Sequence, residues 1–246
     1  MTDLHTHILP GMDDGPKDLD TALALLEQEA EQGVHHVALT SHYHCEGEAL
    51  SSFLDRREQA FAALSAAASP DMDLKRGCEV FFSPALLDID LRALCLEGTD
   101  YLLLELPLLQ RPAFANEVLF GLRARGIVPL IAHVERYLYV RRDPSVLVDW
   151  INLGALIQVN ADSLTGGDAA FVRRLIRWGL VHVLASDAHS VRYRPPELRR
   201  GLEAVADRLG ADRAAALDRN AALIFAGQTV PESEVHRPRK LLGLWL

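Results

Sequence analysis

The sequence contains little cysteine: only Cys45, Cys78 and Cys95 are present. Their odd number and wide spacing argue against a disulfide framework and fit a reducing compartment. The sequence also lacks an apolar run close to the ~20 residues that a membrane-spanning helix requires. Residues 1–5 lack the basic and apolar regions of a signal peptide. We therefore expect a cytoplasmic protein without a membrane span.

Positive charge is scarce relative to negative charge. The chain has 25 Lys and Arg against 34 Asp and Glu, for a formal net charge of −9 at pH 7. Because nucleic-acid binding needs clustered cations, DNA and RNA are not expected as partners. No long linker or low-complexity segment divides the chain. Its 246 residues, 49% of them hydrophobic, suit one large α/β domain with a buried core.

The sequence does contain one recurring unit, in which an amphipathic helix is followed by a glycine and a short apolar strand. In the first unit, Leu19, Leu23 and Leu26 share one helical face, and Gly33 follows. Glycine is favoured just past a helix end because it adopts the left-handed conformation without penalty. The later units carry Phe114, Val118 and Leu122 before Gly126, Val146 to Trp150 before Gly154, and Phe171, Leu175 and Trp178 before Gly179.

Helices that alternate with nearly continuous apolar strands predict a parallel sheet covered on both faces. About seven strands are expected, near residues 2–4, 36–40, 74–78, 101–104, 128–132, 155–159 and 182–185. The predicted fold is therefore α/β, and its architecture is a seven-stranded βα barrel. An open, doubly wound sheet is the alternative.

The segment 228–246 differs in character from the barrel expected over residues 1–227. It holds a basic cluster at 236–240 and then an apolar end at 241–246. We expect a C-terminal tail that docks on the domain or is frayed. A contact with a partner or a membrane surface is the alternative, since basic residues beside apolar ones can serve either.

Polar side chains able to bind metal or substrate follow nearly every expected strand. These residues are His5, His7, His42, Glu79, Glu105, His133, Asn160, Asp187 and His189. In parallel barrels the carboxyl ends of the strands meet at one mouth, where sites are built. Burying so many ionisable groups together would be costly unless metal ions paired them. The pattern therefore predicts a metal cluster at the mouth.

The spacing of these residues supports a shared ion. His5 and His7 are separated by one residue, so both side chains point the same way from an extended strand. Asp187 and His189 repeat that spacing. Imidazole suits zinc, manganese and iron, whereas carboxylates suit manganese and magnesium. Carboxylates such as Glu79 also have two oxygens with which to bridge neighbouring ions.

Several segments resemble a known enzyme family. Their order is consistent over residues 1–227, and the opening is similar to that of the PHP (polymerase and histidinol phosphatase) superfamily. The closer resemblance is to the bacterial manganese-dependent tyrosine-protein phosphatases of the CpsB/YwqE type, which are tied to capsular and extracellular polysaccharide synthesis. The loop after His42 diverges, so substrate preference is where this chain is expected to differ. The matching segments are D-L-H-T-H (3–7), L-P-G-M-D-D-G (9–15), T-S-H (40–42), I-A-H-V-E-R-Y (131–137), Q-V-N (158–160), A-S-D-A-H (185–189) and R-P-P (194–196).

This resemblance implies a distorted (βα)7 PHP-type barrel that holds three divalent metal ions at the C-terminal strand ends. Manganese is expected, with zinc, iron and magnesium as alternatives. The implied ligands, none of them substituted here, are His5, His7, Asp14, His42, Glu79, Glu105, His133, Asp187 and His189. By the superfamily pattern, the three ions would be held by His5, His7, Glu79 and Asp187, by Glu79, Glu105 and His133, and by Asp14, His42 and His189.

For such a site we predict phosphate ester hydrolysis by a metal-bridging hydroxide, because a metal lowers the pKa of bound water from about 15.7 to roughly 7. Arg136 and Arg194 closely follow ligand motifs and are expected to clamp the phosphate, a role that the resemblance also implies. Surface ion pairs are the alternative for both arginines. His42, which is also a ligand candidate, or His189 would assist with esters other than those of tyrosine.

The predicted function is a metal-dependent protein-tyrosine phosphatase acting on the phosphotyrosine tail of a polysaccharide-regulating tyrosine kinase. A histidinol-phosphate phosphatase or another small-molecule phosphomonoesterase of the superfamily is the alternative, and a non-catalytic metal-stabilised module is a third. A cysteine-based phosphatase is rejected because the residue six positions beyond Cys45 is Ser51 rather than arginine. The sequence leaves the oligomeric state open, a homo-oligomer included.

Overall fold

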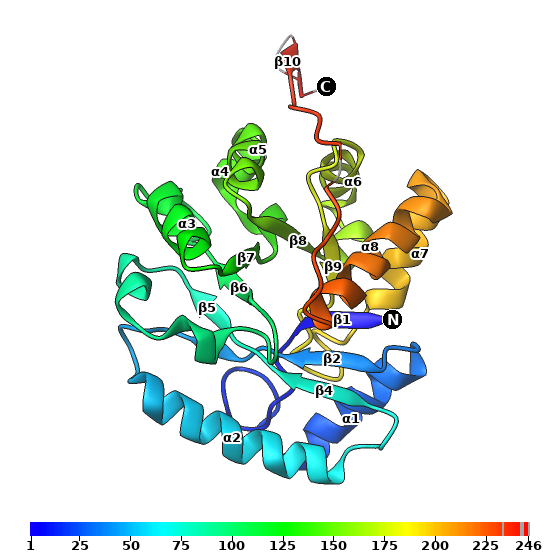
Figure 1. Cartoon of the computed structure of the whole chain (residues 1–246). Helices are drawn as coiled ribbons and strands as arrows, with labels where there is room; N and C mark the ends of the chain where they lie inside the picture. The colour runs from blue at the N-terminus through cyan, green and yellow to red at the C-terminus, as the bar shows by residue number, and fades with distance from the viewer. Residues whose placement is uncertain (233, 242–243, 246) are drawn as a thin grey trace.

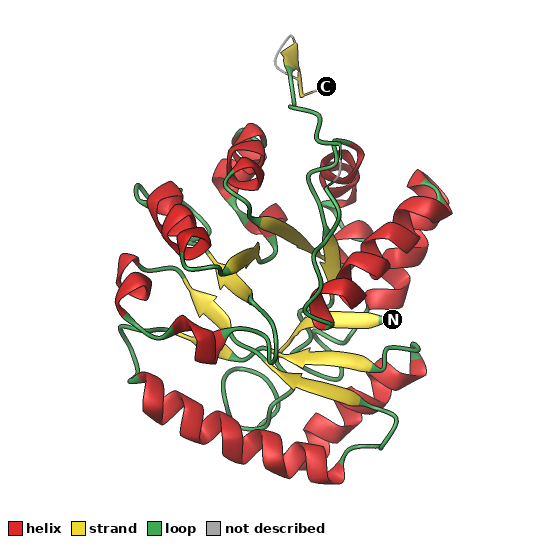
Figure 2. Cartoon of the chain, viewed as in Figure 1, coloured by secondary structure: helices red, strands yellow, loops and turns green. Residues whose placement is uncertain are grey.

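Short parallel strands surround a common axis, and helices cover their outer side (Figures 1 and 2). The computed structural model describes residues 1–232, 234–241 and 244–245. Its barrel strands are β1 (Thr2–Thr6), β2 (His36–Leu39), β3 (His42–Tyr43), β4 (Asp73–Arg76), β5 (Glu79–Phe81), β6 (Tyr101–Glu105), β7 (Val128–Ile131), β8 (Leu156–Asn160) and β9 (Val183–Ala185).

Two of the predicted strands are interrupted. The strands pair in the orders β1-β2-β4 and β3-β5-β6-β7-β8-β9. Strand β3 therefore occupies the same place in the ring as β2, and strand β5 occupies the same place as β4. The ring closes where the backbone N–H of His7 donates to the carbonyl oxygen of Ala188 at 2.8 Å and Thr6 bridges Ala188 in parallel. The strands thus occupy the seven expected positions, and the predicted α/β barrel is confirmed in distorted form.

The outer layer confirms the helices predicted at α1, α3, α5 and α6. Gly33, Gly126, Gly154 and Gly179, which follow them, all have positive φ between 72° and 84°. Phe114 does not belong to the buried face of α3, because it precedes the helix and is 59% exposed. The helices are α1 (Leu19–Glu31), α2 (Leu50–Ala67), α3 (Ala115–Ala124), α4 (Leu138–Arg142), α5 (Ser145–Asn152), α6 (Ala169–Arg177), α7 (Leu198–Leu209) and α8 (Ala211–Phe225), and the 3-10 turns are η1 (Pro84–Asp88), η2 (Leu91–Leu94), η3 (Val134–Arg136) and η4 (Asp162–Leu164).

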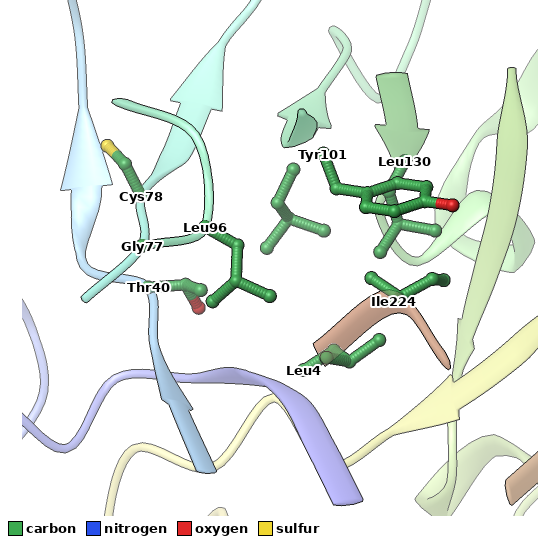
Figure 3. Close-up of a pocket in the computed structure, with 9 residues that line it drawn as sticks. Leu4, Thr40, Gly77, Cys78, Leu96, Tyr101, Leu130 and Ile224 are labelled. Atoms are coloured by element: carbon green, nitrogen blue, oxygen red, sulfur yellow. The ribbon is translucent and has the colours of Figure 1, made fainter. Parts of the chain in front are cut away.

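Apolar side chains fill the barrel interior below the mouth. Leu4, Leu130 and Ile224 line one small gap there, and Figure 3 shows them pointing toward one another. The gap holds about 10 Å³, roughly the room that one water needs. Ile224 comes from α8, so this helix contributes to closing the interior. The barrel is therefore a packed core rather than a pore, and chemistry is confined to its mouth.

The C-terminal segment runs along the barrel and then away from it (Figure 1). The Tyr101 hydroxyl donates to the carbonyl oxygen of Gln228 at 2.7 Å, and Arg237 pairs with Asp149 at 2.6 Å. Two short antiparallel strands, β10 (Lys240–Leu241) and β11 (Leu244–Trp245), follow. Residues 233, 242–243 and 246 of the predicted tail lie outside the described residues. In the described part of the chain, no helix is both long and apolar enough to cross a membrane.

Candidate metal centre

The C-terminal strand ends bring the predicted ligands to one mouth. His5 lies within β1, and His42 in β3 stands opposite Glu79 in β5. Glu79 was expected to follow its strand but instead begins β5, because the strand resumes after the break. Glu105 ends β6, as expected. Of the remaining ligand candidates, His7 and Asp14 follow β1, His133 follows β7, and Asp187 and His189 follow β9.

Four donor atoms form the tightest group of the site. The Nε2 atoms of His5 and His7 are 3.1 Å apart. They lie 3.3 and 3.2 Å from Oε2 of Glu79, and 3.4 and 3.6 Å from Oδ1 of Asp187. Both imidazole nitrogens therefore face one oxygen of each carboxylate, and His5, His7 and Asp187 form a group whose donor atoms lie within 4.8 Å of one another. This group contains the same residues as the first predicted ligand set.

A second group shares Glu79. Nε2 of His133 lies 2.8 Å from Oε1 of Glu79 and 3.6 Å from Oε1 of Glu105. On the other side, Oε2 of Glu79 lies 2.9 Å from Nδ1 of His42. His42, Glu79 and Glu105 also form a group whose donor atoms lie within 4.8 Å of one another. Glu79 therefore uses both oxygens, the geometry expected of a bridging carboxylate.

The third group gathers around Asp14, which lies on the turn after β1. Its Oδ1 is 3.2 Å from Nε2 of His189 and 3.5 Å from Nε2 of His42. His7 joins this group, and its ring stacks on that of His189 with centroids 3.9 Å apart. Asp14 is 63% exposed, whereas His189 is 4% exposed, so this group faces the solvent side of the cluster.

Burial and charge perturb the titration of these groups. Burial opposes ionisation of Glu79, yet the surrounding histidines, His5 first among them, hold its pKa well below the ordinary value. Burial, followed by the charge of Glu79, raises the pKa of Glu105. Burial also opposes the charged form of His7, but its contacts with Asp13 and Glu79 raise its pKa to about 10. Burial, followed by the charge of nearby His7, lowers the pKa of His189 to about 4.

Several buried atoms of the cluster lie close to one another, yet none of them has a partner in hydrogen-bonding geometry among the described residues. They are Nδ1 of His42, Oε2 of Glu79, Nδ1 of His133 and Nε2 of His189. Buried polar atoms without partners are rare, because each pays the cost of leaving water without compensation. Oxygen and imidazole donors that converge in this way fit divalent cations such as manganese, zinc or iron. The residues present therefore fit the metal group that the sequence predicted.

Two ligand candidates adopt unusual backbone conformations. Among described residues other than glycine, only His133 and Asp187 have positive φ, at 29° and 57°. Such conformations are sparsely populated and persist where the surroundings enforce them. Gln158 accepts a hydrogen bond from the backbone N–H of His133 at 2.7 Å, and that of Asp187 donates to the carbonyl oxygen of His5 at 2.8 Å. The fold thus holds both residues toward the mouth.

The two predicted phosphate-binding arginines lie beside the cluster. Arg194 Nη2 is 2.7 Å from Oδ2 of Asp187, and Arg136 Nη1 is 3.5 Å from the same oxygen. Arg194 also lies 3.8 Å from Asp14. Both guanidinium side chains are near 40% exposed, at 42% for Arg136 and 40% for Arg194. They are open to an anion that approaches the mouth.

Sequence reasoning missed Asp13 as a residue that orients the ligands, and it named Asn160 only as a polar group at a strand end. Oδ2 of Asp13 accepts from Nδ1 of His7 at 2.8 Å and from the backbone N–H of His42 at 3.0 Å. Asn160 donates to Oδ2 of Asp187 at 2.8 Å. Asp13 stands next to the predicted ligand Asp14, so neighbouring acidic residues were the available signal. Which of the two would face the histidines depends on the turn, and that is a tertiary property.

Comparison with known proteins identifies the family. A family model described as "Capsular polysaccharide synthesis, CpsB/CapC" matches residues 1–225. The chain belongs to the CpsB/CapC family. Tyrosine-protein phosphatase YwqE of Bacillus subtilis is 32% identical over 256 residues, covering 100% of both chains. Tyrosine-protein phosphatase CpsB of Streptococcus pneumoniae is 28% identical, covering 87% of this chain and 93% of its own.

Solved structures agree with this membership of the CpsB/CapC family. One chain comes from the crystal structures of YwqE from Bacillus subtilis and CpsB from Streptococcus pneumoniae, described as unique metal-dependent tyrosine phosphatases. It matches with a TM-score of 0.88 and 27% identity over 98% of this chain and 100% of that one. A D-hydantoinase from Thermus matches with a TM-score of 0.55 and 10% identity, a likeness of fold alone. The predicted family, fold and enzyme class are confirmed, since relatives of this CpsB/CapC protein are metal-dependent phosphatases.

Proposed function

We propose that this chain is a metal-dependent protein-tyrosine phosphatase with its active site at the barrel mouth. The observation that carries the proposal is the pair of imidazole Nε2 atoms of His5 and His7, which lie 3.1 Å apart and 3.2 to 3.6 Å from carboxylate oxygens of Glu79 and Asp187. Burying two imidazoles and two carboxylates against one another is costly, and a cation between them would offset that cost. Membership of the CpsB/CapC family supports the same reading.

We propose three divalent ions, with manganese first among the alternatives, held by the nine predicted ligands. His5, His7, Glu79 and Asp187 would hold the first ion. Glu79 would bridge to a second, with Glu105 and His133. Asp14, His42 and His189 would hold the third, on the more exposed side. When bound, the ions would supply positive charge for the phosphoryl oxygens and lower the pKa of water so that hydroxide forms near neutral pH.

The protein's own side chains would orient the phosphate for in-line attack. Arg194 and Arg136 present donors at the mouth beside Asp187 and would clamp two phosphoryl oxygens, stabilising negative charge as it develops. His42 is partly exposed and would assist esters with poorer leaving groups than tyrosine. A tyrosine oxygen, with a pKa near 10, leaves with little acid assistance.

The substrate we propose is the phosphotyrosine tail of a polysaccharide-regulating tyrosine kinase, met in the cytoplasm. The names of the CpsB and YwqE relatives support phosphotyrosine, and the family description supports the polysaccharide context. The barrel of residues 1–227 would carry the activity, with residues 228–246 as an appended tail. A histidinol-phosphate phosphatase of the same superfamily remains the competing proposal.

One experiment tests this function directly. The manganese-loaded protein would be assayed on a phosphotyrosine peptide and on histidinol phosphate, with a chelator-treated sample as control. We expect higher kcat/KM on the peptide and loss of turnover after chelation. Preference for histidinol phosphate would replace the substrate assignment, and full turnover without metal would overturn the mechanism. Elemental analysis of the same sample would count and identify the ions.

A further inference from the structure

A groove next to the metal centre has no role in the site described so far. It lies beyond the ends of β3 and β5 and has a volume of about 450 Å³. Its lining residues are His44, Cys45, Glu46, Gly47, Phe81, Phe82 and Ser83. Most of its exposed surface is carbon, since two phenylalanines and an imidazole form its walls. This groove occupies the divergent loop that sequence analysis identified after His42.

The two sides of the groove are tied together before any ligand arrives. The ring of His44 stacks on that of Phe81, with centroids 4.9 Å apart and an interplanar angle of 25°. The Ser83 hydroxyl donates to Oε1 of Glu46 at 2.5 Å and accepts from the backbone N–H of Ala85. The loop is therefore preorganised, which lowers the entropy cost of binding a ligand in it.

The groove begins where the ligand groups end. His42 and Glu79 are opposite each other in the β3–β5 ladder. Two residues further along the chain, His44 directly follows β3 and Phe81 ends β5. Phe81 stands opposite Glu105 in the β5–β6 ladder. The rings of His42 and His44 are 6.2 Å apart. An aromatic ring joined to a metal-bound phosphate through one oxygen would therefore reach the groove.

We propose that this groove is an aryl subsite that receives the phenyl ring of the phosphotyrosyl substrate. This inference rests on the proposed function and deepens it, because it names the feature that would select aryl over alkyl phosphomonoesters. Aromatic and imidazole faces stack favourably on a phenyl ring, whereas an alkyl phosphate offers them no face. Aryl esters therefore gain binding energy in the groove that alkyl esters lack.

A second pocket at the mouth offers a poorer wall for an aryl ring. Tyr193 is 92% exposed, with little packed around its ring. The pocket it borders, of about 220 Å³, is mainly polar and also includes the carboxylates of Asp162 and Glu197. Among the residues that line this pocket, which include Arg192 and Arg194, Tyr193 alone is aromatic, whereas the groove has two phenylalanine rings and an imidazole. The groove at His44 and Phe81 is thus the better match to an aryl phosphate.

Kinetic selectivity provides the first test. Phe81→Leu keeps an apolar strand residue but removes the aromatic face, and His44→Ala changes the loop wall independently. Phe120→Leu is the matched control, since Phe120 is 66% exposed on α3 and does not line the groove. For metal-loaded proteins, we expect each groove variant to lower the ratio of kcat/KM on a phosphotyrosine peptide to that on an alkyl phosphate by about threefold to tenfold, mainly through KM.

The thiol of Cys45 provides a second readout that does not depend on turnover. It lines the groove and is partly exposed, whereas Cys78 and Cys95 are buried and serve as internal references. We expect a peptide carrying phosphonomethylphenylalanine to slow alkylation of Cys45 in the metal-loaded protein. A matched alkyl phosphonate peptide should slow it much less. Equal protection by both would overturn the aryl subsite, because phosphate binding alone would then close the groove.

The outcomes separate this inference from the proposed function. If the unsubstituted protein does not hydrolyse the phosphotyrosine peptide, the proposed function fails. If it does, and both groove variants keep the unsubstituted selectivity ratio, the aryl subsite is wrong while the function stands. A loss of selectivity in Tyr193→Ala with none in Phe81→Leu or His44→Ala would also overturn it, since the ring would then stack on Tyr193.

Discussion

Replacing Asp13 with asparagine tests whether the turn after β1 orients the metal ligands. Asp13 is 5% exposed, and its Oδ2 holds Nδ1 of His7 at 2.8 Å and the backbone N–H of His42 at 3.0 Å. Its Oδ1 accepts from the backbone N–H of Gly15 at 3.0 Å. Asparagine has the same shape but only one acceptor oxygen. Whichever way its amide turns, at least one of these donors loses its partner, and His7 loses a neighbouring charge.

The size of the effect follows from these contacts. A hydrogen bond to a charged group contributes about 1.5 to 3 kcal/mol. Loss of a residue that orients a metal ligand typically costs about 10- to 100-fold in metal affinity or activity, which is about 1.4 to 2.7 kcal/mol. The two ranges agree. We therefore expect Asp13→Asn to weaken metal binding by about 10- to 100-fold, with partial recovery of turnover at high metal concentration.

The assay is a chelator-buffered manganese titration followed by phosphatase turnover. The matched control is Asp20→Asn, because Asp20 is an exposed acidic residue in the first turn of α1, away from the ligands. The control should bind metal as the unsubstituted protein does. Asp13→Asn with unchanged metal affinity and unchanged turnover would refute the claim that this carboxylate orients His7 and His42.

Three further predictions use other parts of the molecule. Arg136→Ala should lower kcat/KM on phosphotyrosine while elemental analysis shows unchanged metal content; unchanged turnover would remove Arg136 from phosphate binding. Burial lowers the pKa of His182 from 6.5 to about 4, so the stability that depends on its neutral ring is full above about pH 6.5 and is lost as the pH falls toward about 4. Between about pH 7 and about pH 5, the free energy of unfolding should fall by about 2 kcal/mol because of this group. Denaturant titrations should show a smaller fall for His182→Asn, whose side chain can still accept from the backbone N–H of Ile157. An equal fall in both proteins would count against His182 as the cause. Gly201→Ala places a Cβ 2.6 Å from that of Ala161, so thermal unfolding should reveal a destabilisation of about 1 to 3 kcal/mol, and an unchanged Tm would show that α7 shifts freely.

Much of the fold could be predicted because each unit carries a local signal. Apolar periodicity located α1, α3, α5 and α6, and the glycines that follow them have the positive φ expected. The breaks between β2 and β3 and between β4 and β5 were not predicted. The breaks fall at Thr40–Ser41 and Gly77–Cys78, residue types that do not by themselves end a strand, so the pairing with neighbouring strands decides where hydrogen bonding stops.

The packing of α8 illustrates the same limit. Its Ile224 helps to close the barrel interior with Leu4 and Leu130, which are distant in the sequence. An amphipathic pattern predicts that a helix buries one face, but it does not predict which surface that face meets. The contact depends on closure of the ring between β1 and the segment after β9.

The candidate site divides in a similar way. The residue types and their places after apolar strands sufficed to propose His5, His7, Glu79, His133 and Asp187 as ligands, because parallel strands must bring their carboxyl ends to one mouth. The strand period also put His5 and His7 on one face. These features depend on local geometry, which neighbouring residues determine.

The tertiary structure alone decided how these groups meet. It turned Asp13 inward and left Asp14 63% exposed, although the two are adjacent in the chain. It gave Glu79 contacts on both oxygens and placed the groove of His44 and Phe81 beside the ligands. Side-chain distances across strands depend on register, twist and loop packing, which are set by contacts between residues far apart in sequence. The sequence by itself determined which donors the mouth would contain, and the fold decided which of them share a centre.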